Sequence, residues 1–185
     1  MSNAANVTTG KPRVAGAVYR APLGTTIPTD ASTALDTAFA ELGFVSEDGV
    51  ANNNSQESDN IKAWGGQVVL VVTTEKPDEW TMTLIEAMNV EVLKTVYGDD
   101  NVTENTQAGT ITVKATAAEL AASIYVIEVV MKGGAKKRIV IPLGVPKELG
   151  EITYRDDEAV GYELTLSALP DTTGTTHYEY IQIPT

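Results

Sequence analysis

The feature that most limits how this chain can fold is the strict alternation in residues 160–169, VGYELTLSAL. Apolar side chains occupy every second position from Val160 to Ala168, with polar or small residues between them. Successive side chains of a β-strand point to opposite faces, whereas a helix would scatter these residues around its axis. The segment therefore predicts a strand with one face on a core and the other toward solvent.

Most of the remaining chain also shows strand patterns. Residues 67–74, QVVLVVTT, are apolar on both faces, which favours a strand in a sheet that is covered on both sides. Residues 79–86 place Trp80, Met82 and Leu84 on one face. Further strands are predicted at residues 16–22, 109–115, 123–132, 136–142, 150–156 and 177–183. The sequence thus predicts a mainly β fold, a sandwich or barrel-like domain with one short flanking α-helix.

Two segments show helical spacing. The first follows Asp30, a residue that often caps helices, and its apolar positions are Leu35, Ala38, Phe39 and Leu42. The second follows Asn89, and its apolar stripe is formed by Val90, Leu93, Val96 and Tyr97. Gly98 stands where a C-terminal residue with positive φ is expected, so this second helix is the better defined one.

Three polar segments are expected outside the packed core. Residues 1–15 lack a packing pattern and predict an N-terminal arm, and residues 177–185 predict a C-terminal strand or arm. A single β-domain remains over residues 16–176. Within it, residues 47–62 are expected to form a long polar loop, because almost no side chain there can pack. A loop of this length inside a compact domain is usually functional or disordered.

A basic cluster lies near the middle of the chain, in the segment MKGGAKKRIVIP. It holds four of the thirteen basic residues: Lys132, Lys136, Lys137 and Arg138. Gly133 and Gly134 lie between two strand patterns and predict a two-residue hairpin turn, because the favoured turns need positive φ. This turn would place Lys132 opposite Ala135.

Counting back from that turn divides the cluster between two faces. Glu128 pairs with Ile139 and lies diagonal to Lys137, while Lys136 and Arg138 point to the other side. The cluster is then a solvated hairpin tip, a grip for phosphates, or a contact with acidic residues of a neighbouring copy. We favour the contact between copies.

The charge balance argues against general affinity for nucleic acid. The 185 residues include 25 acidic and 13 basic side chains, and the formal net charge is −12. Binding to DNA or RNA is dominated by Lys and Arg that neutralise phosphates, so a surface this acidic repels them. There is no cysteine, which excludes disulfides and thiolate metal sites.

No segment suggests a membrane span or a secretory signal. The longest apolar runs, such as Val68–Val72, are far too short to cross a bilayer, and the N-terminus lacks the regions of a signal peptide. We therefore expect a soluble protein that is made inside a cell and does not insert into membranes.

The sequence gives little support for catalysis or for a cofactor. His177 is the single histidine, no nucleophile-elbow motif accompanies it, and a polar strand residue is the simpler interpretation. The acidic clusters Glu47-Asp48, Asp99-Asp100 and Asp156-Asp157-Glu158 are interpreted as turns and solvated edges rather than cation sites. The segment DDNVTEN, residues 99–105, has some oxygen ligands of a calcium loop but lacks its glycine. No enzyme activity, metal or cofactor is expected.

Instead, the chain has more apolar strand surface than one helix can cover. Either two layers pack tightly, or part of this surface is buried against other copies. Polar arms and loops would then become ordered on contact with a neighbour.

Four segments resemble the major tail tube proteins of long-tailed, non-contractile bacteriophages and related prophages. They are LDTAFAELGFVSEDGV (35–50), TLIEAMNVEVLKTVYGDDNV (83–102), KGGAKKRIVIP (132–142) and ITYRDDEAVGYELTLSALPD (152–171). The resemblance implies a structural virion protein without catalytic residues, assembled in the host cytoplasm. Its protomers would form hexameric rings that stack into a tube around the tape-measure protein. This tube would contact an initiator (distal tail) protein and a terminator protein.

The resemblance also implies roles for particular segments. The protomer would be a β-sandwich with a flanking helix, whose sheet joins those of neighbours in a continuous inner barrel through which DNA passes without specific binding. The loop that reaches the next ring would contain Glu47, Asp48, Asn52, Asn53, Asn54, Glu57 and Asp59. A hairpin that contacts a neighbouring subunit would contain Glu128, Lys132, Lys136, Lys137 and Arg138.

Two other functions remain open at this point. A β-sandwich adhesin or binding module of a phage tip or cell surface commonly presents aromatic platforms on loops. Here Trp64 and Trp80 lie at or inside strand patterns, which argues against it. A small hydrolase would have to use His177.

Overall fold

The computed structural model describes residues 2–13 and 16–184. Residues 1, 14 and 15 of the predicted N-terminal arm, and residue 185 of the predicted C-terminal arm, lie outside the described residues. The predicted class is confirmed: over the described residues the chain is mainly β, with one α-helix and a large antiparallel sheet. In the described part of the chain, no helix has the length and apolar character needed to cross a bilayer.

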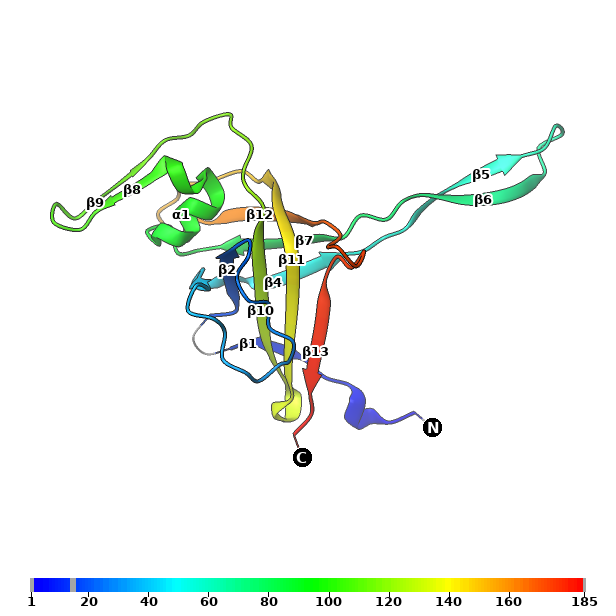
Figure 1. Ribbon diagram of the computed structural model, residues 1–185, viewed down its shortest axis with the longest axis horizontal. Helices are drawn as coiled ribbons and strands as arrows, with labels where there is room; N and C mark the ends of the chain where they lie inside the picture. The colour runs from blue at the N-terminus through cyan, green and yellow to red at the C-terminus, as the bar shows by residue number, and fades with distance from the viewer. Residues whose placement is uncertain (1, 14–15, 185) are drawn as a thin grey trace.

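The elements follow one another along the chain as labelled in Figure 1. The strands are β1 Gly10–Pro12, β2 Val18–Pro22, β3 Ala40–Glu41, β4 Val45–Asn53, β5 Glu57–Lys62, β6 Val68–Glu75, β7 Glu79–Leu84, β8 Val102–Asn105, β9 Thr110–Val113, β10 Ser123–Met131, β11 Lys136–Leu149, β12 Tyr162–Ala168 and β13 Tyr178–Gln182. The helices are α1 Val90–Tyr97 and three 3₁₀ turns, η1 Ala4–Asn6, η2 Asp99–Asn101 and η3 Lys132–Gly134.

The main sheet has the strand order β3-β2-β10-β11-β12-β7-β4, and all its pairs are antiparallel. β1 pairs with the last residues of β10, beyond the part that pairs with β2. β13 pairs with the first part of β11. β11 is 14 residues long, and its last part pairs with β12. In Figure 1, β10, β11 and β13 run steeply across β12, β7 and β4, so the sheet folds over itself around a core. Within residues 2–13 and 16–184 the sheet does not close into a barrel.

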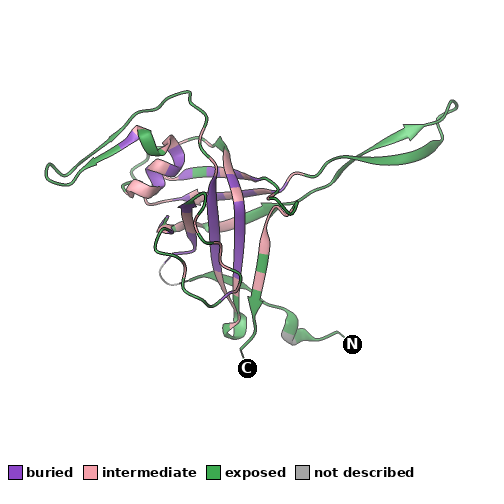
Figure 2. Cartoon of the chain, viewed as in Figure 1, coloured by how far each residue is buried: buried purple, intermediate pink, exposed green. Residues whose placement is uncertain are grey.

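Two apolar clusters lie on opposite faces of the β10–β11 pair. Tyr125 and Ile127 contribute to the larger cluster, which packs against β7, β12 and α1. Ile124 and Val126 contribute to the smaller one, which the segment between β2 and β3 and strand β13 cover. Figure 2 shows these central strands as the most continuously buried part of the molecule.

The alternating segment forms β12 as predicted. Tyr162, Leu164, Leu166 and Ala168 are buried, and the residues between them are at most half-buried. The helix after Asn89 is also confirmed, because the Asn89 side chain accepts a hydrogen bond from the backbone N–H of Glu91. Gly98 ends it with φ of 97°.

The helix predicted after Asp30 is wrong. The Asp30 carboxylate accepts hydrogen bonds from the backbone N–H groups of Ser32 and Thr33, and Asp36 accepts one from Ala38. These side chains stabilise successive turns that compete with the helix for the same backbone groups. The covering segment between β2 and β3 is therefore irregular.

Two further expectations are corrected. Residues 150–156 do not form a strand, although Ile152 still packs against the larger core. Residues 47–62 are not an irregular loop, because most of them belong to β4 and β5. The polar composition reflects strands that the protomer leaves uncovered rather than an absence of regular structure.

Candidate assembly surfaces

β5 and β6 form a two-stranded hairpin that projects from the body (Figure 1). All residues of both strands are exposed (Figure 2). The five apolar residues Val68–Val72 have exposed fractions between 40% and 59%. The expectation that this segment is covered on both faces is therefore wrong for the protomer. An isolated hairpin is marginal in water, and an apolar patch of this kind marks an interaction site.

Trp64 lies in the turn at the tip of this hairpin, and its side chain is wholly exposed. Gly65 and Gly66 follow it with φ of 111° and 90°, values that suit glycine. Trp80, in contrast, is buried in the larger core. Trp64 was expected at or inside a strand pattern, and it lies in the turn between β5 and β6, so the position of this tryptophan does not argue against an aromatic residue presented on a loop.

The root of the hairpin is held by a buried carboxylate, Asp78, which is 3% exposed. Asn52 of β4 donates to its Oδ1 at 2.8 Å, and Thr176 donates to its Oδ2 at 2.6 Å. His177 also contacts Oδ2 through Nδ1, and its ring packs edge-on against Trp80, with ring centroids 5.2 Å apart. The group thus connects β4, the start of β7 and the segment that leads into β13.

The pKa of Asp78 is lowered by this environment. Burial by itself raises the pKa, but hydrogen bonds from Thr176, His177 and Asn52 favour the charged form and outweigh it. Sequence reasoning had missed Asp78, and it had treated His177 only as a polar strand residue. Neither has a local motif, because their partners lie far away along the chain.

The predicted turn at Gly133 and Gly134 is off by one residue. The N–H of Met131 bonds to the carbonyl of Ala135, and the three residues of η3 form the turn between them. Glu128 consequently faces Arg138 rather than Ile139. The alternation of faces holds, so Lys137 and Arg138 still point to opposite sides of the sheet.

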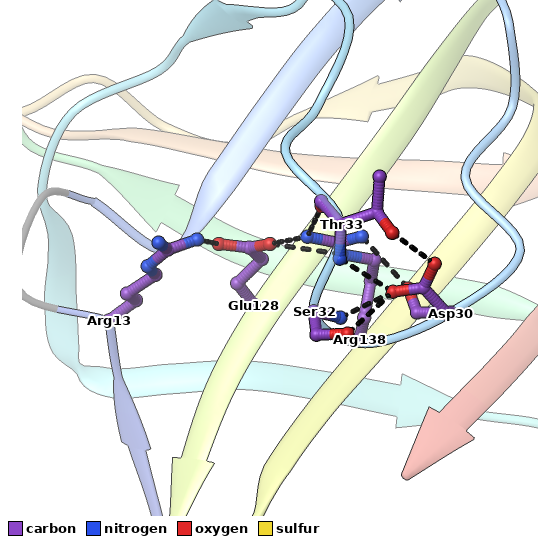
Figure 3. Close-up of polar contacts among 6 residues, drawn as sticks. All are labelled: Arg13, Asp30, Ser32, Thr33, Glu128 and Arg138. Atoms are coloured by element: carbon purple, nitrogen blue, oxygen red, sulfur yellow. Dashed lines mark hydrogen bonds and ion pairs between the residues drawn. The ribbon is translucent and has the colours of Figure 1, made fainter. Parts of the chain in front are cut away.

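Arg138 is buried in an ion network (Figure 3). Its side chain is 1% exposed and contacts Glu128, with Nε at 2.9 Å from Oε1. The same guanidinium donates to the backbone carbonyls of Asp30 and Thr33, at 2.8 and 2.9 Å. Arg13 contacts the other oxygen of Glu128 from the N-terminal segment. The network joins the sheet, the covering segment and the N-terminal segment.

The remaining cluster residues lie apart from this network. Lys137 pairs with Glu179 of β13 at 2.6 Å, and Lys132 and Lys136 are exposed. The cluster therefore does not present one continuous positive surface. Its role in contacts between subunits stays a prediction.

A groove of about 670 Å³ separates β4 from β1 and β10. Ile127 and Val129 of β10, with Val45 and Val50 of β4, supply apolar walls. β4 pairs with β7 along one edge, and no described strand pairs with its other edge. The groove therefore lies between the free edge of β4 and the part of the same curved sheet formed by β1 and β10.

The residues predicted for an inter-ring loop are distributed over these features. Glu47 and Asp48 line the groove at the irregular part of β4. Glu57 and Asp59 lie on the projecting hairpin. Asn53 ends β4 and Asn54 follows it. Asn52 points inward to Asp78, as described above.

The match to a protein-family model agrees with this picture of a structural subunit. The family model described as phage tail tube protein matches residues 4–184. No curated protein sequence matches the chain. Among solved structures, the cap of the anti-feeding prophage, described as a tube-terminating cap, aligns with a TM-score of 0.37 and 11% identity. The alignment covers 88% of this chain and 94% of that one.

The open sheet, the exposed apolar hairpin and the family match define a structural protein of a phage tail. The chain belongs to the phage tail tube protein family. Membership implies a non-enzymatic, structural role in the virion.

Proposed function

We propose that this protein assembles into stacked hexameric rings that form the tail tube of a long-tailed, non-contractile phage or related prophage. The tube surrounds the tape-measure protein and ends at initiator and terminator proteins. DNA passes through it into the host without specific binding. Assembly takes place in the cytoplasm of the bacterial host.

The exposed β5–β6 hairpin is the observation that carries this proposal. Burial of apolar surface contributes about 25 cal/mol per Å², so an apolar strand left in water on both faces gains strongly from a partner. The hairpin projects from the body in Figure 1, which suits a contact with another copy. In this proposal Glu57 and Asp59, the acidic residues of the predicted inter-ring loop that lie on the hairpin, take part in that contact.

The charge of the chain supports the conduit. A negatively charged tube wall does not bind DNA and so lets it pass. Each contact between a cation and a phosphate would instead add affinity for DNA, and the repeated subunits would multiply that affinity. The net charge is −12, and seven of the thirteen basic side chains form ion pairs in the described part of the chain, Arg138 with Glu128 and Lys137 with Glu179 among them. Repulsion between acidic copies is then offset by apolar burial at the interfaces.

Electron microscopy of the purified protein tests the proposal. We expect rings or hollow tubes with six subunits around the axis, at high protein concentration or after addition of a tail initiator. Particles that remain single protomers under all these conditions would contradict the assembly, and another rotational symmetry would contradict the hexamer.

A further inference from the structure

We propose that the tip of the β5–β6 hairpin, with Trp64 as its anchor, inserts into the groove between β4 and β1–β10 of a second copy. This inference rests on the proposed self-assembly and names the surface that receives the hairpin. The first support is that an exposed apolar side chain and an open apolar groove occur on the same chain. The tip carries a wholly exposed tryptophan, and the groove has apolar walls with no strand across it.

The size of the groove suits such an anchor. Its volume of about 670 Å³ falls in the range of pockets that enclose organic groups, and it is large enough for an aromatic side chain and its flanking backbone. Tryptophan is the residue most often found at the energetic centre of an interface, where it is fully desolvated. The free edge of β4 adds backbone groups that an incoming strand can pair with.

Charge complementarity supports the same pairing. Lys11 lines the groove on the β1 side, and Glu47 and Asp48 line it on the β4 side. The hairpin brings both signs to this site, with Asp59 on β5 and Lys62 next to the tip. Asp59 and Lys62 are three residues apart and so lie on opposite faces of β5. In the proposed complex one orientation of the hairpin turns Asp59 toward Lys11 and Lys62 toward Glu47 and Asp48, so the charges favour that orientation.

The positions of the hairpin tip and the groove within one chain indicate that the groove receives the tip of a second copy. β4 lines the groove with its first residues, Val45–Val50, and leads into the hairpin beyond its last residue, Asn53. In Figure 1 the hairpin extends away from β1, so the tip does not reach the groove of its own chain. An interface between two different surfaces of one chain is heterologous, and such contacts generate rings when the rotation closes.

Cross-linking tests the contact directly. The chain has no cysteine, so the double variant Ala63→Cys/Phe44→Cys carries only the two thiols introduced at the tip and at the groove. Under mild oxidation of the assembled protein we expect a ladder of disulfide-linked oligomers. Each single variant is a control, and the pair Ala63→Cys/Met88→Cys is a matched control, because Met88 is exposed before α1 and does not line the groove.

Replacing Trp64 by a small polar residue tests how much its side chain contributes to the free energy of assembly. Trp64→Ser is expected to raise the protein concentration needed for assembly at least about tenfold, the effect of losing an interface hot spot. Met88→Ser removes another exposed apolar side chain and should change the protein concentration needed for assembly little. Both variants should unfold in urea like the wild-type protomer, because neither side chain packs against the body.

The outcomes separate this inference from the proposed function. Tubes that form without the tip-to-groove cross-link, or that tolerate Trp64→Ser, overturn the groove as the receiving surface and leave the tube function standing. A wild-type protein that never assembles overturns both.

Discussion

The guanidinium of Arg138 is buried at a point where three parts of the chain meet. Its five N–H groups allow it to contact Glu128 and two backbone carbonyls of the covering segment at once. A lysine offers a single point charge and could not reproduce this geometry. One residue thus holds an irregular segment to the sheet where the predicted helix does not form.

Replacing Arg138 is therefore expected to destabilise the protomer strongly. Arg138→Met leaves the Glu128 carboxylate with Arg13 alone, and loss of one member of a buried pair costs about 3–5 kcal/mol. Lys136→Met removes the same charge from an exposed position of the same strand and should cost less than about 1 kcal/mol. Urea unfolding measures both, and equal free energies of unfolding for the two variants would contradict the structural role of Arg138.

Asp78 is expected to make the free energy of unfolding depend on pH in the acidic range. Its pKa is lowered in the folded protein, so the contribution of its charged form is complete above the ordinary pKa of about 3.9 and is lost as pH falls through the folded value. Asp78→Asn should destabilise the protein by about 2 kcal/mol at pH 7, because buried donors lose their charged acceptor. The difference from wild type should shrink as the pH falls below 4.

Thermal unfolding from pH 7 to pH 2 measures this difference. Asp100→Asn serves as control, because Asp100 is an exposed carboxylate in η2. A deficit in Asp78→Asn that stays constant down to pH 2 would show that the charge of Asp78 does not stabilise the fold.

At the scale of elements, the same apolar pattern has two different outcomes. Ile124–Ile127 of β10 are fully buried between two clusters, whereas Val68–Val72 of β6 are exposed. Both segments are apolar on both faces, and only their neighbours in the protomer differ. This difference supports the proposal that β5–β6 is a surface for assembly.

Removing the hairpin should separate folding from assembly. Replacing residues 56–74 by a short Gly-Ser turn removes strands that share hydrogen bonds only with each other, so the rest of the fold should keep its free energy of unfolding. Assembly should be lost, as judged by sedimentation and electron microscopy. A shortened protein that still forms normal tubes would refute the role of the hairpin.

The β8–β9 hairpin offers a matched control for that deletion. It too pairs only within itself and projects from the body in Figure 1, but its strands carry fewer exposed apolar residues. Shortening its turn at residues 106–109 should leave assembly intact.

For the whole molecule, charge is the property that matters to a conduit. Assembled tubes should not retain double-stranded DNA even at about 50 mM salt, where a protein that contacts phosphates binds most tightly. A sedimentation assay with labelled DNA measures retention, with a basic DNA-binding protein as positive control. Salt-dependent retention would contradict a negatively charged lumen.

Local sequence determined the elements whose stabilising contacts lie within a few residues. The alternation of residues 162–168 specifies a strand, and Asn89 and Gly98 define the ends of α1. The mainly β class followed from the same patterns, and the family followed from four recognisable segments. The charge balance also indicated a protein that does not grip nucleic acid.

Only the tertiary structure decided the features that depend on residues far apart in the chain. Asp30 could have capped a helix, but its turn is completed when Arg138 binds the backbone carbonyls beside it. Whether an apolar strand is covered depends on which strands reach it, and a local pattern contains no such information. The groove, the root at Asp78 and the exposed hairpin arise from these long-range pairings, because a surface exists only once the whole sheet has folded.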